Sequence, residues 1–292
     1  MTRIINCKNY CFRKYNIIYY GVIRSGAYPK KTKKKYKVIE CQKCGLIKLN
    51  PFPKISYITK EYRNRYNLKL SINNYKKFNN TKQKVEFFKI NRNSIKNKTI
   101  LDHGAGYGFL LDDIKKISKK TLAIEPQKNL HSFLENKKHE IVNHLSPNPQ
   151  LFNKVDVVTS VGVVEHVRNP LDYLRLSFKL LKKGGKLHIC TDNFFDILMD
   201  LDIKEFKEFY FRTAHYWYFN SKNLRNLLLK AGFKKLKLKY IHNHGFNNFL
   251  HWAENKKPLN DNNIKINKVN KKWIYTLEKT GKSELLIFEC EK

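Results

Sequence analysis

Long apolar runs are missing from this chain of 292 residues. No stretch approaches the ~20 consecutive apolar residues that a membrane helix needs. Residues 1–7 also lack the continuous apolar segment of a secretory signal peptide. Acidic residues are few: 24 of them face 59 basic ones, which leaves a formal net charge of +35. These absences predict a cytoplasmic protein without a membrane span.

Arginine is scarce among the basic residues, with 10 arginines against 49 lysines. Arginine is the residue favoured for bidentate contacts with phosphates and base edges. Lysine, Asn, Ile and Tyr share A/T-rich codons, so a compositional bias accounts for much of the charge. A selected polyanion-binding surface is the alternative, because residues 30–35 form a local basic cluster. Nucleic acid stays an open partner that the composition does not favour.

Cysteines are few and unevenly distributed: Cys7, Cys11, Cys41, Cys44, Cys190 and Cys290. The first four form two pairs about thirty residues apart, a spacing that suits four thiolates around one Zn²⁺. Gly45 follows the C-x2-C pair, where the backbone must turn tightly around a metal. Reduced, buried cysteines are the alternative, since disulfides are uncommon in the cytosol. We predict a structural zinc bound by Cys7, Cys11, Cys41 and Cys44.

The pattern of residues 99–125 indicates a specific kind of binding site. A short buried strand at 99–103 precedes Gly104, Gly106 and Gly108, which alternate with single residues before a helical pattern. Glycine tolerates a positive φ and allows a ligand to approach the backbone, so strand, turn and helix form a nucleotide-sized cradle. A second strand ends in Glu125, about twenty residues on, where a carboxylate can bind two ribose hydroxyls.

With Asp102 before the turn, this D-x-G-x-G-x-G pattern and Glu125 resemble the first two motifs of class I S-adenosylmethionine-dependent methyltransferases. The resemblance implies S-adenosylmethionine as cofactor, with its methionine portion at residues 104–108 and its ribose at Glu125. It also implies adenine near residues 144–146, where the acidic residue common in the family is missing. The predicted cofactor-binding residues are Asp102, Gly104, Ala105, Gly106, Gly108, Glu125, Pro126, Ser146 and Ser160.

Strand and helix alternate regularly from residue 99, which predicts an α/β, Rossmann-like fold with helices on both faces of a parallel sheet. The expected strands are 99–103, 121–125, 139–143, 155–160, 186–191, 234–241 and 284–290. Helices are expected at 170–181 and, with Ser221 as N-cap, at 221–230. The resemblance implies the strand order 3-2-1-4-5-7-6 with the last strand antiparallel.

The region before the sheet has a likeness of its own. Residues 38–51 are similar to the N-terminal zinc ribbon of many bacterial class I methyltransferases, including sugar methyltransferases. We therefore expect a zinc-ribbon-like module over 1–58, a helical bridge over 59–98 and the methyltransferase domain over 99–292. A polar insertion is expected at about 245–280.

Two histidines are candidates for proton transfer. Glu165 and His166, followed by Pro170, resemble the E-H-V-x-x-P signature of small-molecule methyltransferases. Methyl transfer to a hydroxyl requires removal of its proton, and histidine titrates in a suitable range. We predict His166 as the base, oriented by Glu165, with His215 as the rival. Packing and capping roles are the alternative for all three residues.

The whole pattern predicts a cytoplasmic, S-adenosylmethionine-dependent methyltransferase that acts on a small molecule. Family analogy favours a sugar or sugar nucleotide in surface polysaccharide biosynthesis as the acceptor, although a fold does not fix a substrate. An RNA methyltransferase, supported by the charge, is one alternative. A catalytically inactive cofactor-binding protein, supported by the unusual adenine loop, is the other. The sequence does not distinguish O-, N- and C-methylation and gives no oligomeric state.

Overall fold

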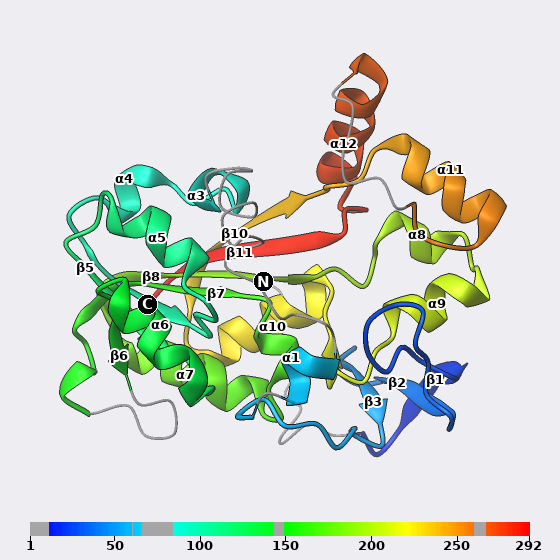
Figure 1. The fold of residues 1–292 in the computed structure, drawn as a ribbon, viewed down its shortest axis with the longest axis horizontal. Coiled ribbons are helices and arrows are strands. Elements are labelled where there is room, and N and C mark those ends of the chain that lie inside the picture. Colours follow the sequence, from blue (N-terminus) through cyan, green and yellow to red (C-terminus); the bar gives the residue numbers. More distant parts are fainter. Residues whose placement is uncertain (1–11, 60, 66–83, 143–148, 260–266) are drawn as a thin grey trace. The chain divides into compact units, whose positions relative to one another are not determined.

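The computed structural model describes residues 12–59, 61–65, 84–142, 149–259 and 267–292 (Figure 1). The chain forms two compact units, each assembled from three segments. The first unit comprises Met1–Lys54, Thr191–Asn226 and Leu238–Ile287. The second unit comprises Ile55–Cys190, Leu227–Lys237 and Phe288–Lys292. The units interleave along the chain, and the three consecutive modules expected from the sequence stay a prediction.

The first unit contains a four-stranded antiparallel sheet in the order β1-β2-β3-β9. Its strands are β1 (Tyr15–Gly21), β2 (Tyr36–Cys41), β3 (Ile47–Asn50) and β9 (Trp217–Tyr218). One face is buried: Val38, Leu49 and Tyr218 pack in a single apolar cluster with residues of three helices. These helices are α8 (Ile197–Asp200), α9 (Lys204–Tyr210) and α11 (Phe246–Asn255).

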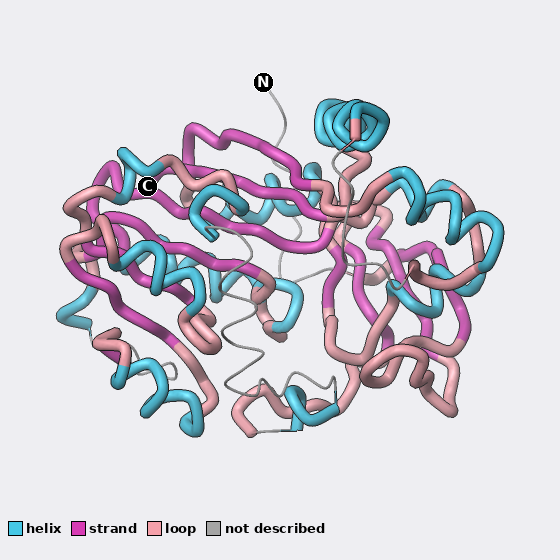
Figure 2. The backbone as a smooth tube through the Cα atoms, turned by 45° about the horizontal axis from the view of Figure 1, so that its top comes forward, coloured by secondary structure: helices cyan, strands magenta, loops and turns pink. Residues whose placement is uncertain are grey.

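The second sheet has seven strands in the order β10-β11-β8-β7-β4-β5-β6, and the strands of both sheets are drawn in magenta in Figure 2. They are β4 (Thr99–His103), β5 (Lys120–Ile124), β6 (Glu140–Val142), β7 (Val155–Val161), β8 (Leu181–Asp192), β10 (Lys234–Ile241) and β11 (Leu285–Glu291). The pairs β4–β5, β4–β7, β5–β6 and β7–β8 are parallel. The spatial order matches the predicted 3-2-1-4-5-7-6 arrangement.

The direction of β11 follows from backbone hydrogen bonds at its two ends. Lys292 N donates to Gly185 O at 2.9 Å, while Asn193 N donates to Glu284 O at 2.7 Å. Higher numbers in one strand therefore meet lower numbers in the other, so β11 runs antiparallel to β8. The predicted antiparallel last strand is confirmed.

Helices cover both faces of this sheet, as expected for a parallel sheet. Val157 on β7 packs with Ile114 of α5 (Phe109–Lys115) on one face. On the opposite face, the Ser160 hydroxyl of β7 lies 2.7 Å from the hydroxyl of Tyr173 in α7 (Pro170–Leu180). Residues 157 and 160 point to opposite sides of a strand because side chains alternate. The α/β fold class is confirmed.

The remaining elements are short or flank the sheets. They are α1 (Glu61–Arg65), α3 (Lys84–Phe87), α4 (Arg92–Ile95), α6 (His131–Asn136), α10 (Ser221–Ala231), α12 (Lys268–Thr280) and the 3-10 helices η1 (Lys128–Leu130), η2 (Pro149–Leu151) and η3 (Val164–His166). The predicted polar insertion thus contains α11 and α12. Among the helices of the described ranges, none has the length and apolar character to cross a membrane.

The cap of α10 differs from the prediction. The Asn220 side chain accepts from Asn223 N at 2.9 Å, and the Asn223 side chain accepts from Asn220 N at 3.0 Å. This reciprocal pair is a capping box built from two asparagines. Ser221 was predicted as the N-cap, and that prediction is wrong because the box places the cap one residue earlier.

Candidate functional site

The turn after β4 requires its glycines. Gly104, Gly106 and Gly108 have φ angles of +101°, +56° and +77°, which side chains rarely adopt. A Cβ on Gly104 would lie 2.4 Å from Val163 Cγ2, so this residue also keeps the turn close to the loop after β7. The alternating glycines are therefore explained by backbone geometry and close packing.

The backbone amides of this turn are bonded within the protein. Gly104 N and Ala105 N both donate to Ile124 O, at 2.8 and 3.0 Å, at the end of β5. Gly106 N donates to Glu125 Oε2 at 2.7 Å. Gly108 N donates to Ala105 O at 2.9 Å. The turn is consequently fixed to the end of the neighbouring strand before any ligand binds.

Glu125 lies at the centre of this arrangement, with 4% of its surface exposed. Its second oxygen accepts from Gln127 N at 2.8 Å. Burial raises the pKa of the Glu125 carboxyl. The hydrogen bonds from the Gln127 and Gly106 amides and the charge of Arg63 lower this pKa, but burial has the larger effect. A carboxylate oxygen can accept about two hydrogen bonds, so each oxygen retains one acceptor position. Glu125 can accept from two further hydroxyl groups.

Gly106 differs from the other two glycines in its surroundings. Among the described residues, a Cβ there would approach only Arg63 Nη2, at 3.2 Å, the end of a long side chain. Arg63 Nε donates to Gln127 Oε1 at 3.1 Å, and its guanidinium lies 4.7 Å from the centre of the Tyr107 ring. A cation from α1 thus lies beside the turn. Arg63 was not identified from the sequence.

Asp102 is buried beneath the turn and interacts with β7. The Thr159 hydroxyl donates to Asp102 Oδ1 at 2.7 Å. Burial raises the pKa of Asp102 to about 7; the Thr159 bond lowers it and the charge of Glu125 raises it further. The Asp102 side chain thus links β4 to the neighbouring strand β7, and its direct contact with a cofactor stays a prediction.

Ser160 and His103 belong to a buried polar network on the α7 side of the sheet. The Tyr173 hydroxyl donates to His103 O at 3.0 Å and lies 2.7 Å from the Ser160 hydroxyl. The His103 ring stacks on Tyr173, with centroids 4.0 Å apart, and its Nδ1 lies 3.1 Å from the Ser177 hydroxyl. Burial lowers the pKa of His103 to about 3. The hydroxyl of Ser160 is thus used within the protein, and its predicted cofactor contact stays a prediction.

The remaining cofactor predictions are placed only in part. Ala105 is buried within the turn, and Pro126 lies in the bend between Glu125 and Gln127. Ser146 and the predicted adenine loop at 144–146 lie outside the described residues. The structure therefore brings the turn and the Glu125 carboxylate together, and the ribose and adenine contacts stay predictions.

Glu165 and His166 lie on η3, directly after β7 and in the second unit. Glu165 is buried, with 3% of its surface exposed. His166 is half-buried, and its Nδ1 lies 3.3 Å from the Tyr57 hydroxyl. Tyr57 was not identified from the sequence. Its contact orients the imidazole of the predicted base.

His215 lies in the first unit and is buried, with 4% of its surface exposed. Its Nδ1 lies 3.8 Å from Asp192 Oδ2, and the same carboxylate oxygen forms an ion pair with Arg212. Asp192 was not identified from the sequence, and its carboxylate lies beside the ring of the rival base.

The C-x2-C segment forms a tight turn between β2 and β3. Gly45 N donates to Cys41 O at 2.8 Å, and Cys41 N donates to Leu46 O at 2.9 Å. Both Cys41 and Cys44 are buried, and Gly45 has a φ of +67°. Asn223 Nδ2 donates to Gly45 O at 3.0 Å, which links the turn to the cap of α10.

Two buried thiols on one turn fit a tetrahedral zinc site, for which they would supply half of the ligands. Cys7 and Cys11, the other predicted ligands, lie outside the described residues.

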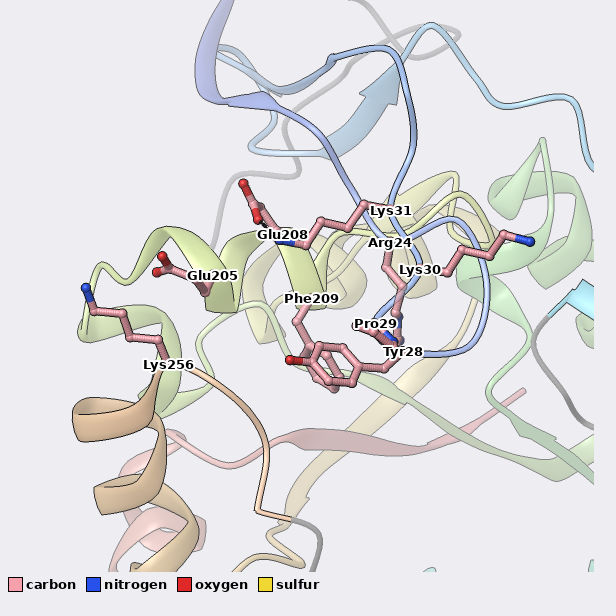
Figure 3. Close-up of a pocket in the computed structure, with 9 residues that line it drawn as sticks. All are labelled: Arg24, Tyr28, Pro29, Lys30, Lys31, Glu205, Glu208, Phe209 and Lys256. Atoms are coloured by element: carbon pink, nitrogen blue, oxygen red, sulfur yellow. Dashed lines mark hydrogen bonds and ion pairs between the residues drawn. The ribbon is translucent and has the colours of Figure 1, made fainter.

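A separate hollow lies within the first unit (Figure 3). Its walls come from residues 24–31, from α9 and from the end of α11: Arg24, Tyr28, Pro29, Lys30, Lys31, Glu205, Glu208, Phe209 and Lys256. The Tyr28 and Phe209 rings meet edge-on at 5.6 Å, and the Arg24 guanidinium lies 4.5 Å from the Phe209 centroid. Lys31 forms an ion pair with Glu208. The hollow combines an aromatic wall with four basic and two acidic side chains.

Residues 77–238, more than half of the chain, match the model of a family described as "Methyltransferase domain". The chain therefore belongs to this methyltransferase-domain family. The prediction of a class I S-adenosylmethionine-dependent methyltransferase domain is confirmed. The predicted zinc and the polysaccharide pathway stay predictions.

Curated relatives carry the name "Ubiquinone biosynthesis O-methyltransferase". The protein from Aliivibrio fischeri is 31% identical over 114 residues, which are 35% of this chain and 47% of the relative. The protein from Ruegeria pomeroyi is 34% identical over 102 residues, which are 32% of this chain and 40% of the relative. The chain thus spans less than half the length of these relatives.

Solved structures are similar at lower identity. A SAM-dependent methyltransferase from Archaeoglobus fulgidus has a TM-score of 0.49 and 17% identity, covering 75% of this chain and 98% of its own. A possible histamine N-methyltransferase from Thermotoga maritima has a TM-score of 0.47 and 19% identity, covering 76% of this chain and 96% of its own.

Proposed function

We propose that this protein transfers a methyl group from S-adenosylmethionine to a hydroxyl group of a small molecule. The observation that supports this most strongly is the Glu125 carboxylate, which the Gly106 and Gln127 amides hold in place with one acceptor position left on each oxygen. The two neighbouring hydroxyls of a ribose need two such acceptors. Membership of the methyltransferase-domain family agrees with this role.

The open side of Gly106 is the proposed place for the methionine portion of the cofactor. Arg63 lies there and is the residue that would neutralise a ligand carboxylate, because a guanidinium matches a carboxylate in shape and charge. The bound cofactor supplies an electrophilic methyl group. The chain's own contribution is to bind it through the turn, Glu125 and Arg63, and to accept the proton of the acceptor.

Calorimetry with S-adenosylmethionine and with its demethylated product tests the cofactor site. Glu125→Ala should weaken binding by roughly 1.5–3 kcal/mol, the value of a hydrogen bond to a charged group. Glu125→Gln, which keeps the shape and one acceptor oxygen, should lose less. The matched control is Glu140→Ala, since Glu140 is an exposed carboxylate on the adjacent strand β6, paired with Lys120. Unchanged affinity in both Glu125 variants would overturn the assignment.

His166 is the proposed base. It follows β7, is half-buried and has its ring oriented by the Tyr57 hydroxyl. His166→Asn should lower turnover by ~10²–10⁴-fold with little change in cofactor affinity. His215→Asn should raise KM for the acceptor more than it lowers turnover. The opposite result would make His215, supported by Asp192, the base; a near-normal rate in both variants would reject both.

The proposed acceptor is a sugar or sugar nucleotide. The relatives' names refer to O-methylation in ubiquinone biosynthesis, but those proteins are matched over less than half of their length. Incubation of a metabolite extract with cofactor carrying a deuterated methyl group, followed by mass spectrometry, identifies the acceptor. A labelled sugar derivative is expected. A labelled phenol would replace the sugar, and label in RNA alone would favour the RNA methyltransferase.

We also propose a structural zinc held by Cys7, Cys11, Cys41 and Cys44. Its support is the closed, buried C-x2-C turn with its left-handed glycine. The metal would stabilise the first unit and take no part in the reaction.

A further inference from the structure

The edge strand of the first sheet carries an aligned set of exposed side chains. Tyr15, Ile17 and Tyr20 on β1 are 40%, 51% and 60% exposed. Their partners on β2 are Cys41, Ile39 and Lys37, which alternate along that strand and share one face. Tyr15, Ile17 and Tyr20 therefore lie on this face together; we call them the β1 face.

A register shift between Ile17 and Tyr19 creates the alignment. In a regular strand, Tyr19 would follow Tyr15 and Ile17 on the same side, and Tyr20 would point to the other. The extra residue at this shift reverses the alternation and turns Tyr20 outward. The opposite face of the sheet is buried, because Val38, Leu49 and Tyr218 lie in the apolar cluster. On the side of the β1 face, Ile39 and Cys41 of β2 are also buried, so the exposed side chains belong to the edge strand β1 itself.

Cations surround the β1 face. The ammonium groups of Lys35 and Lys37 lie 5.5 and 6.0 Å from the centre of the Tyr20 ring. Arg13 and Lys14 are exposed and immediately precede Tyr15. Each end of the aromatic set therefore has basic groups beside it. A second copy of this chain is a poor partner, since both copies carry the same cations and a formal charge of +35.

We propose that the β1 face binds single-stranded nucleic acid. Exposed aromatic rings stack on bases without regard to sequence, and neighbouring lysines neutralise phosphates. Tyr15 and Tyr20 would supply the stacking surfaces, and Lys35 and Lys37 the phosphate contacts. Binding of a strand at the β1 face is independent of which molecule is methylated.

Fluorescence anisotropy of the full chain with a labelled oligouridine of roughly 12 nucleotides tests the proposal. Tyr20→Phe keeps the ring and should bind as the parent does. Tyr20→Leu removes the ring and should weaken binding by roughly 5- to 100-fold. A Lys35→Ala/Lys37→Ala variant should lower the slope of log K against log salt by about 1.4, because each phosphate contact on a single strand contributes about 0.7. Oligothymidine in a parallel arm separates DNA from RNA preference.

Tyr275 and Lys279 on α12 provide the matched control. Tyr275 is 63% exposed, and the Lys279 ammonium lies 5.8 Å from its ring, but the pair is outside the β1 face. Tyr275→Leu and Lys279→Ala should leave binding unchanged.

The proposal would be rejected if Tyr20→Leu and Tyr275→Leu weakened binding equally. It would also be rejected if a duplex bound as tightly as the single strand and Tyr20→Leu had no effect. Either result would mean that the protein attracts nucleic acid through its overall positive charge. A change of oligomeric state in Tyr20→Leu, measured by sedimentation, would identify a protein interface and reject it too.

Discussion

Two turns with left-handed glycines, residues 104–108 and residues 41–45, differ in what completes them. In the turn at 104–108 the amides donate to Ile124 O, Ala105 O and the Glu125 carboxylate, all within the protein. The turn at 41–45 has three backbone bonds, from Cys41 N, Gln42 N and Gly45 N, and the Asn223 contact, and it brings two buried thiols together. The first turn is complete without a ligand, whereas we expect the second to need a metal. Four experiments test this difference.

Metal removal should have the largest effect. Chelation or Cys44→Ser should remove a structural zinc, whose binding contributes on the order of 10 kcal/mol in small zinc modules. Limited proteolysis should then cleave within residues 12–54 while the second unit stays folded. Cys290→Ser is the control: burial raises the pKa of Cys290, whose thiol donates to Leu187 O. If metal analysis found no zinc in freshly purified protein, the expectation that the turn at 41–45 needs a metal would be contradicted.

A methyl group at Gly104 should have the next largest effect. Gly104→Ala combines an unfavourable φ with the Val163 contact at 2.4 Å, a cost of about 2–6 kcal/mol in the free energy of unfolding. Gly184 has a φ of +75°, and no atom of the described residues lies within 4 Å of the Cβ that Gly184→Ala would add, so this change should cost only about 1–2 kcal/mol. Urea unfolding measures both. Equal costs would show that packing against Val163 does not fix the turn.

The pH dependence of stability tests the acid beneath the same turn. The pKa of Asp102 is raised to about 7, mainly by burial, so the folded state retains a proton that the unfolded chain loses near pH 4. Stability is therefore fully present below pH 4 and falls as the pH rises to about 7. Asp102→Asn should gain up to about 4 kcal/mol above pH 7 relative to the parent protein and little near pH 4.

Melting temperatures across pH check the Asp102 prediction. Asp196 is the comparison from the first unit, since burial also raises its pKa to about 7. Asp196→Asn should show the same pH profile. A constant destabilisation of Asp102→Asn at every pH would contradict the prediction.

The smallest effect concerns the bond between α10 and the cysteine turn. Asn223→Ala should lose the bond from Asn220 N and the contact with Gly45 O, at a cost of about 1–2 kcal/mol. Asn223→Asp keeps an acceptor for Asn220 N and cannot donate to Gly45 O. The difference between the two variants in urea unfolding isolates the bond from Asn220 N. If Asn223→Asp lowered the affinity for zinc and Asn223→Ala did not, the added negative charge would be the cause, and the hydrogen bond from Asn223 to Gly45 O would not affect zinc binding.

The seven-stranded sheet was largely predictable: its central strands are apolar segments between polar loops, and β10 alternates lysine with apolar residues. The strand expected at 99–103 is found at Thr99–His103, and the one at 234–241 at Lys234–Ile241. The strand expected at 186–191 begins five residues earlier, because Leu181 pairs with Val155 of β7, and Gly184 and Gly185 form backbone hydrogen bonds with Lys292. The local sequence pattern is sufficient to predict a strand where both faces of that strand are buried, because such a strand must be apolar along its length.

Residues that act through tertiary contacts were not predictable in this way. Tyr57 and Arg63 come from segments whose own pattern shows no site, and only folding places them beside His166 and Gly106. The β1 face depends on one register shift, which no composition reveals. The capping box at Asn220 was missed because Ser221 is an equally good local candidate.

The pairing of β3 with β9 affects how the protein is made. Ile47 pairs with Tyr218, so the first sheet joins segments separated by roughly 170 residues. At 5–20 residues per second, a ribosome needs roughly 10–30 s to synthesise the intervening chain. During that interval β3 has no neighbour on one side and offers an open edge for mispairing. Slowing translation between residues 50 and 217 should therefore increase aggregation of nascent chains.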